Sequence, residues 1–218
     1  MLLAVLMVLA TGIAALLPAV AEDGGNEAKI GETEYATLEA AIKAAKDGDT
    51  ITLLRDLSMK ISKPYNYIYK DITIDGGDAM HKITASGGYT FQFCDSFTLK
   101  NLKLDTQAGF RFWNTSRNGR EAVVGTLENV EWTVGKGLFV NLQGEKSGIP
   151  QTLNLIRSTV TKTAVAGDPI IATYDKGGSD ITINIEDRVL NQNGGQTNAH
   201  TGYKSLLFVY QKGLVTLM

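Results

Sequence analysis

The chain repeats a strand, a polar corner and a second short strand every 25 to 29 residues, and this repeat restricts its fold more than any other feature. Apolar and polar residues alternate in each strand. The repeats begin at Ile72, Phe97, Gly125, Thr152 and Ile181. With one extra residue allowed in the fourth repeat, the corners fall at Gly76, Asn101, Asn129, Ser158 and Asp187. These small residues can take a positive φ or bond their own backbone, so we predict a ladder of turns.

A second series of strands runs out of phase with the first. These strands open at Gly88, Gly109, Gly137, Pro169 and Ser205. Two registers in one repeat imply several strands in each turn of a coil. Each repeat contains too many strand-like segments for a helical repeat protein. We therefore predict an all-β fold, a right-handed, single-stranded parallel β-helix of roughly five coils over residues 49–218.

One short helix is expected before the coils. Thr37 is a suitable N-cap, and Leu38, Ala41, Ile42 and Ala45 form an apolar stripe at helical spacing. Gly48 suits the left-handed conformation that often follows the last residue of a helix. The sequence therefore predicts a helix from Thr37 to Asp47. Because the open end of a coil stack needs a cover, we expect residues 22–48 to form a linker and a capping helix.

Both ends of the chain are apolar. Residues 1–21 end in Ala19-Val20-Ala21 and predict a signal peptide cleaved before Glu22, although a positively charged start is missing. An uncleaved membrane anchor is the alternative, and both interpretations predict a secreted or cell-surface protein. The last residues form an apolar strand with no polar cover, so we expect a C-terminally truncated piece of a longer protein.

The composition narrows the class of protein. The chain is 44% hydrophobic and 20% charged, which indicates a globular fold rather than disorder. A net charge of -2 gives no basic field that could bind nucleic acid. We also expect a monomer. Cys94 is the only cysteine, so an intramolecular disulfide is excluded. Its alternation with Phe91 and Phe93 predicts a buried residue, with a reactive thiol as the alternative.

The N-terminal unit also carries a family resemblance. The stretch GETEYATLEAAIKAAKDGDTITLLRD, followed by coils rich in Thr and Ile, resembles the pectate-lyase-like right-handed parallel β-helix superfamily, especially exported repeat proteins of bacterial cell surfaces. This resemblance implies the fold. It leaves the activity open, because the fold carries lyases, hydrolases, adhesins and inert spacers.

The best candidates for carbohydrate binding lie in FRFWNTSRNGRE. Arg111, Arg117 and Arg120 supply charge, and Trp113 supplies a ring that can stack on a sugar. The alternative is a solvated loop between coils. A lyase on this scaffold would need a base near bound calcium or a basic cluster, and no catalytic partner recurs in adjacent coils.

Other candidate sites are weaker. Asp75 and Asp78 are candidate calcium ligands, but a simple turn explains them equally well. His81 and His200 lie far apart without the spacing of a zinc site. We expect no cofactor. The sequence favours a non-catalytic surface or adhesion module that presents loops and strand faces to a polysaccharide or host-cell glycan, with a polysaccharide lyase as the alternative.

Overall fold

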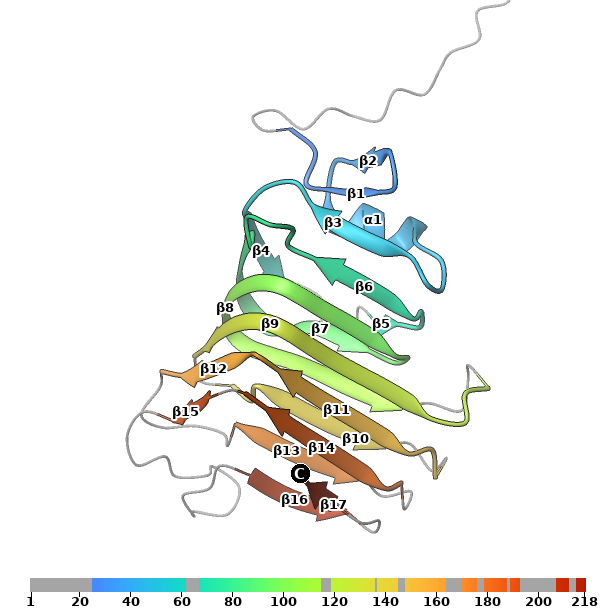
Figure 1. Cartoon of the computed structure of the whole chain (residues 1–218), viewed down its shortest axis with the longest axis vertical. Helices are drawn as coiled ribbons and strands as arrows, with labels where there is room; N and C mark the ends of the chain where they lie inside the picture. Colours follow the sequence, from blue (N-terminus) through green and yellow to red (C-terminus); the bar gives the residue numbers. More distant parts are fainter. Residues whose placement is uncertain are drawn as a thin grey trace, which may run out of the picture.

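The structure is a computed structural model that describes residues 25–61, 67–114, 119–135, 137–144, 148–163, 170–175, 179–187, 189–192, 207–211 and 215–218. The predicted signal peptide, Arg117 and His200 lie outside these residues. The described strands form one 17-stranded sheet wound into stacked parallel coils, with one short helix near the N-terminal end (Figure 1). The predicted parallel β-helix is therefore confirmed, with about four turns in place of the roughly five that the repeat predicted. Within the described ranges, no helix has the length and apolar composition needed to cross a membrane.

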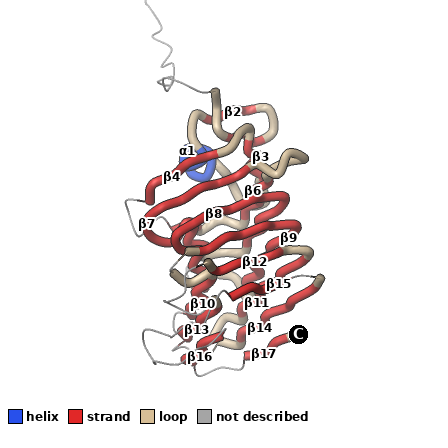
Figure 2. Tube along the Cα trace, turned by 90° about the vertical axis from the view of Figure 1, so that its left-hand side faces the viewer, coloured by secondary structure: helices blue, strands red, loops and turns tan. Residues whose placement is uncertain are grey.

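Three parallel faces make up the solenoid, as the turned view in Figure 2 shows. The first face contains β3 (Thr50–Leu53), β6 (Ile72–Asp75), the first part of β8 (Phe97–Asn114), the first part of β9 (Val123–Val134), β11 (Gln151–Ile156), β14 (Ile181–Glu186) and β17 (Val215–Leu217). The second contains β4 (Leu57–Ile61), the first part of β7 (Lys82–Phe93), the middle of β8, the end of β9, β12 (Thr159–Lys162) and β15 (Val189–Gln192). The third contains β5 (Tyr67–Ile68), the ends of β7 and β8, β10 (Val140–Gly144), β13 (Ile171–Asp175) and β16 (Leu207–Gln211). The first predicted series, with its strand, corner and second short strand, thus forms the first and second faces, and the second predicted series forms the third.

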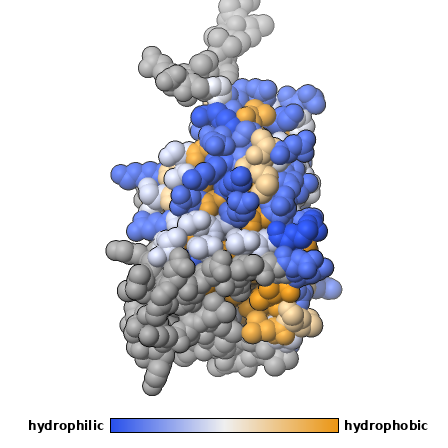
Figure 3. Space-filling model, turned by 60° about the vertical axis from the view of Figure 1, so that its left-hand side comes forward, coloured by the Kyte–Doolittle hydropathy of each residue, from blue (hydrophilic) through white to orange (hydrophobic). Residues whose placement is uncertain are grey.

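Alternation along each strand produces the core. On the first face, Ile51, Ile74, Leu99, Leu127 and Leu155 stack in register and are fully buried. Their neighbours Thr50, Thr73, Thr98, Thr126 and Asn154 point outward. Cys94 is buried, as its alternation with phenylalanine predicts. The surface view in Figure 3 is mainly hydrophilic over the N-terminal coils, with hydrophobic residues gathered near the lower end.

Aromatic side chains fill the middle of the core. The rings of Phe93 and Phe97 stack with their centroids 3.9 Å apart. Trp132 packs against Phe110 and donates from Nε1 to the hydroxyl of Thr106 at 2.8 Å. Since that bond satisfies the indole N–H, the tryptophan can be buried without an unpaired donor.

The corner ladder follows the prediction at the second, third and fifth repeats, whereas at the first the left-handed residue is Gly77, with a φ of 67°, rather than Gly76. Asn101, Asn129 and Asp187 have positive φ angles of 52°, 55° and 47°. The fourth corner is Arg157, at 45°, so the prediction of Ser158 is wrong. No residue is inserted there, since Ile156 pairs directly with Glu128 and Glu186 on the neighbouring strands.

Ser158 lies one position inside the coil, where its hydroxyl replaces backbone hydrogen bonds. The hydroxyl oxygen accepts from Val130 N at 3.1 Å, and the hydroxyl O–H donates to Ile156 O at 2.9 Å. At the first corner, glycine is required because the backbones of Gly76 and Asn101 lie close together. An added Cβ on Gly76 would lie 2.0 Å from Asn101 O. Asn129 donates to Asn101, which donates to Asp75, so the corner side chains also bond to one another.

The helix α1 (Leu38–Ala44) begins as predicted and ends early. Thr37 is the N-cap, and its hydroxyl accepts from Ala40 N at 3.1 Å. The prediction of a helix to Asp47 is wrong because Ala45 is extended and the carboxylate of Asp49 accepts from Lys46 N at 2.7 Å. Gly48, with a φ of 85°, then makes the turn into β3.

A hairpin precedes the helix and was not predicted. Its strands are β1 (Ala28–Ile30) and β2 (Thr33–Tyr35), and β1 pairs antiparallel with β3. The open edge of the first coil is therefore covered by β1 as well as by α1 (Figure 1). Strands of three residues are too short for their alternation to be recognised in the sequence.

Candidate functional site

Four side chains form an outward row across the third face. Tyr67 of β5, Gln92 of β7, Arg111 of β8 and Asn141 of β10 lie in register on adjacent strands. The residues that follow them, Ile68, Phe93, Phe112 and Leu142, are buried in the core. Because side chains alternate along a strand, the row points away from the core. Gln92 and Asn141 are nevertheless only 3% and 5% exposed. We call these four residues the third-face row.

Aromatic rings surround the guanidinium of this row. The Arg111 Cζ atom lies 4.9 Å from the centroid of the Tyr89 ring and 5.8 Å from that of Trp113. Tyr67 packs against Trp113 with the ring centroids 5.4 Å apart. The Arg111 Nη1 atom donates to Gln92 Oε1 at 3.3 Å. The ring contacts and this hydrogen bond hold the guanidinium in one orientation.

Two buried polar atoms of the row have no hydrogen-bond partner in the part of the chain that the structure describes. They are Arg111 Nε and Asn141 Oδ1. The Asn141 amide nitrogen is satisfied, since it donates to the Tyr89 hydroxyl at 3.0 Å. An unsatisfied buried polar group costs about 1–3 kcal/mol, so such atoms mark a place for water or a polar ligand.

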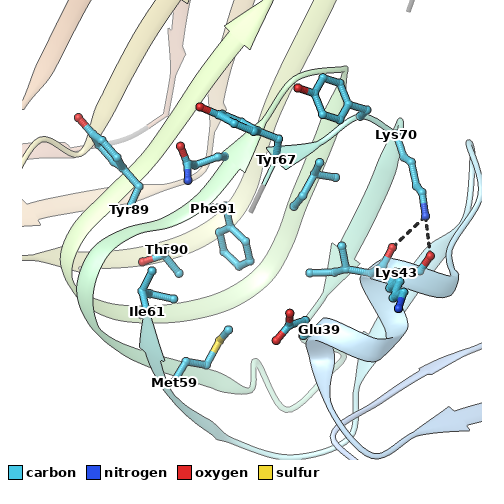
Figure 4. Close-up of a pocket in the computed structure, with 13 residues that line it drawn as sticks. Glu39, Lys43, Met59, Ile61, Tyr67, Lys70, Tyr89, Thr90 and Phe91 are labelled. Carbon is cyan, nitrogen blue, oxygen red and sulfur yellow. Dashed lines mark hydrogen bonds between the residues drawn. The ribbon is translucent and has the colours of Figure 1, made fainter. Parts of the chain in front are cut away.

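A cavity of about 460 Å³ lies beside the row, between α1 and strands β4, β5 and β7. Figure 4 shows Met59, Ile61 and Phe91 on the coil side, and Glu39 and Lys43 of α1 on the helix side. The remaining lining residues are Ile42, Tyr67, Ile68, Tyr69, Lys70, Tyr89, Thr90 and Gln92. Since Tyr67, Tyr89 and Gln92 line it, the cavity is continuous with the site around the third-face row.

Lys70 fixes the helix against this cavity. Its Nζ atom donates to the carbonyl oxygens of Ile42 at 3.1 Å and Lys43 at 2.8 Å. These carbonyls belong to the last turn of α1, where a cation also interacts favourably with the helix dipole. The helix wall of the cavity is therefore tied to the strand side by a charge-assisted contact.

The structure separates the predicted basic residues. Arg111 and Trp113 lie together near the end of β8, on a strand rather than in a loop between coils. Arg120 instead donates from Nε to both oxygens of Asp95 at 3.1 Å, and from Nη2 to Asp47 at 2.9 Å. The hydrogen bond and charge of Asp95 raise the pKa of Arg120. We therefore assign Arg120 to an ion-pair cluster and leave it out of the candidate site.

Of the predicted calcium residues, Asp75 ends β6 and Asp78 lies in the turn that follows. Asp75 Oδ1 accepts from Gly77 N and Asn101 Nδ2, while Oδ2 pairs with Lys100 at 3.2 Å. Burial acts to raise the pKa of Asp75, but the hydrogen bonds lower it overall. Over the described residues there is no group of three or more His, Cys, Asp or Glu that could hold a metal ion. Asp78 is exposed in the same turn.

No protein-family model, curated protein or solved structure matches this chain. The parallel β-helix is shown by the structure, whereas membership of the pectate-lyase-like superfamily and a bacterial origin stay predictions.

Sequence reasoning missed Tyr67, Tyr89, Gln92 and Asn141 as site residues. An alignment that sets Phe91, Phe110 and Val140 in one column would have placed Gln92, Arg111 and Asn141 in the next. The repeat therefore contains the signal, but only once the strand register is known.

Proposed function

We propose that this protein is an exported, non-catalytic surface module that binds a polysaccharide or cell-surface glycan at the third-face row. The observation that supports the proposal best is the pair of buried, unpartnered atoms, Arg111 Nε and Asn141 Oδ1, beside the rings of Tyr67, Tyr89 and Trp113. One of these atoms is a donor and the other an acceptor.

The arrangement suits the chemistry of a sugar. A pyranose ring offers an apolar C–H face, which can pack on an aromatic ring, and hydroxyl groups that both donate and accept hydrogen bonds. Arg111 Nε can donate to one hydroxyl and Asn141 Oδ1 can accept from another. Satisfying both atoms removes the cost of leaving them unpaired, which favours the bound state.

The scaffold also suits recognition. The four row residues lie on paired parallel strands, and Arg111 is braced by Gln92 and Tyr89. Side chains held in this way lose little rotamer freedom when a ligand binds, so more of the contact energy contributes to affinity.

The alternative is a polysaccharide lyase. The Arg111 guanidinium donates to Gln92 Oε1 at 3.3 Å, which supports its use as a hydrogen-bond donor to a bound glycan. Incubation with polygalacturonate, alginate and chondroitin, followed by ultraviolet absorbance of the unsaturated product, distinguishes the two functions. We expect no product, and turnover that Arg111→Ala abolishes would contradict a non-catalytic role.

Export is part of the same proposal. It is supported by the apolar segment and the small residues before Glu22. Mass spectrometry of secreted protein should find a chain that begins at Glu22. Secreted protein that retains residues 1–21 would favour the membrane-anchor alternative.

Binding is tested by calorimetry and tryptophan fluorescence with cellohexaose, chitohexaose, xylohexaose and alginate oligosaccharides. Trp113 lies at the site and Trp132 is buried, so the emission change on binding should disappear in Trp113→Phe. Arg111→Ala should weaken binding by roughly tenfold or more, since it removes a charged hydrogen-bonding group. Lys103→Ala, an exposed change on the second face, is the matched control. No binding to any of these glycans, or equal losses in the control, would overturn the proposal.

A further inference from the structure

The cavity beside α1 differs from the third-face row in its chemistry. The row offers amide and guanidinium groups, whereas the cavity wall includes the apolar side chains of Ile42, Met59, Ile61, Ile68 and Phe91. We propose that this cavity selects an N-acetylated sugar and receives its acetamido group. This inference rests on the proposed function, because the sugar ring that carries the acetamido group would lie against Tyr67 and Tyr89.

The apolar wall disfavours an unsubstituted sugar. Around its edge such a sugar carries hydroxyl and hydroxymethyl groups, and a hydroxyl turned toward Phe91 or Met59 would lose its water without gaining a partner. A methyl group in the same place removes apolar surface from water. The acetyl methyl of an N-acetylhexosamine meets this requirement.

The helix side of the cavity offers complementary polar groups. Glu39 is exposed on α1 and faces the cavity across from the coil side (Figure 4). Its carboxylate can accept the acetamido N–H, and the Lys43 ammonium can donate to the acetamido oxygen. An acetamido group thus finds an apolar contact for its methyl, an acceptor for its N–H and a donor for its carbonyl.

The size of the cavity agrees with a whole sugar unit. Its volume of about 460 Å³ lies in the range of small-molecule sites, which is about 300–1,000 Å³. The shared residues Tyr67, Tyr89 and Gln92 connect it to the third-face row. A chain of sugars can therefore place one unit in the cavity and the next against Arg111 and Trp113.

Cellohexaose and chitohexaose form the decisive pair of probes. Both are β-1,4-linked glucose-type chains, and they differ in a hydroxyl or an acetamido group at carbon 2 of each unit. Calorimetry with the full chain should show chitohexaose binding about tenfold or more tightly than cellohexaose, as expected for an added apolar group in a fitted pocket.

A cavity-filling variant tests whether the cavity causes the preference for chitohexaose. Ile42→Trp places a large ring in the cavity and should remove the preference for chitohexaose while leaving cellohexaose affinity within about twofold. Ala44→Trp, at an exposed position of the same helix, is the matched control. Methyl-labelled methionine NMR of the unaltered chain gives a second measurement, in which the Met59 signal should shift with chitohexaose and not with cellohexaose.

The outcomes separate this inference from the proposed function. Equal affinity for the two probes, or no binding of either, would overturn the acetamido site. Equal affinity that Arg111→Ala still abolishes would leave glycan binding at the row intact. A chitohexaose preference that Ile42→Trp removes and Arg111→Ala leaves unchanged would support the cavity and contradict the role of the row. An unshifted Met59 signal during tight chitohexaose binding would also overturn the acetamido site.

Discussion

The Arg120 Nε atom lies 3.1 Å from both carboxylate oxygens of Asp95, whose side chain is 1% exposed. The same guanidinium reaches Asp47, at the turn after α1, with an Nη2–Oδ2 distance of 2.9 Å. These contacts link three segments that are far apart in the sequence. Arg120 therefore joins the loop before β9 to the N-terminal cap and to the end of β7.

Arg120→Ala should lower the free energy of unfolding by about 2 kcal/mol. The change leaves the buried Asp95 charge without its guanidinium partner. The figure lies below that of a fully buried pair because 37% of the Arg120 side chain is exposed. Urea denaturation measures the loss, and Lys82→Ala, which breaks the exposed pair with Asp105, should cost less than about 1 kcal/mol. Equal losses in the two variants would contradict the special role of Arg120.

Asp71→Asn should stabilise the protein at neutral pH. Burial, and then the negative charge of Asp95, raise the pKa of Asp71 in the folded state. Ionising such a carboxyl opposes folding, so its contribution to stability is present below the pKa of the unfolded chain, near pH 4, and is lost as pH rises through the folded-state value. Urea denaturation at pH 7, 5 and 3 should show an advantage of the asparagine variant that shrinks toward pH 3. A constant difference at all three pH values would contradict this linkage.

Gly109→Ala should lower the free energy of unfolding by about 3 kcal/mol. A Cβ at this position would lie 1.9 Å from the backbone oxygen of Phe139, and Gly109 N also donates to Leu138 O at 2.8 Å. The two backbones would have to separate, which disrupts the ladder between β8 and β10. Gly25→Ala, where an added Cβ meets nothing within 4 Å, is the control. Thermal unfolding compares them, and equal melting temperatures would show that the close approach is unimportant.

Arg157→Asn should raise the free energy of unfolding by about 0.5–1 kcal/mol. Arg157 holds a φ of 45°, a left-handed conformation that asparagine tolerates better. The exposed ion pair with Glu128 is lost, but such pairs contribute little. Chemical denaturation measures the gain, and Arg157→Ala, which loses the same pair without favouring the left-handed conformation, is the matched control. A destabilised asparagine variant would argue against strain at this corner.

Leu38→Asp should unfold the cap locally. Leu38 is fully buried beneath the hairpin, and an ionised aspartate there would cost about 3–5 kcal/mol. Because coils interact mainly with their neighbours, hydrogen exchange should rise in β1, α1 and β3 while β9 and β11 stay protected. Ala40→Asp, an exposed change on the same helix, should leave exchange nearly unaltered. Unchanged protection of Thr50–Leu53 in Leu38→Asp would show that α1 does not protect the first coil.

The sequence by itself determined the features that depend on residues close to one another in the chain. Alternation along the strands predicts the strands themselves and the burial of residues such as Ile74 and Leu99. The local preference of Thr37 for an N-cap and of Asn101 and Asn129 for left-handed corners is also confirmed. These features follow from backbone sterics and short-range hydrogen bonds, which do not require knowledge of the rest of the chain.

Tertiary structure alone decided the register between coils and everything that depends on it. Arg157 occupies a corner because the preceding residue, Ile156, pairs with Glu128 and Glu186, not because arginine favours that conformation. Asn141 donates a hydrogen bond to Tyr89, which lies 52 residues earlier in the sequence. Strand β1 covers the edge of β3, although β3 comes later in the chain. The physical reason is that loops of different length lie between the strands. Only the pairing of backbone groups across coils, optimised together with core packing, sets which outward side chains meet on the third face.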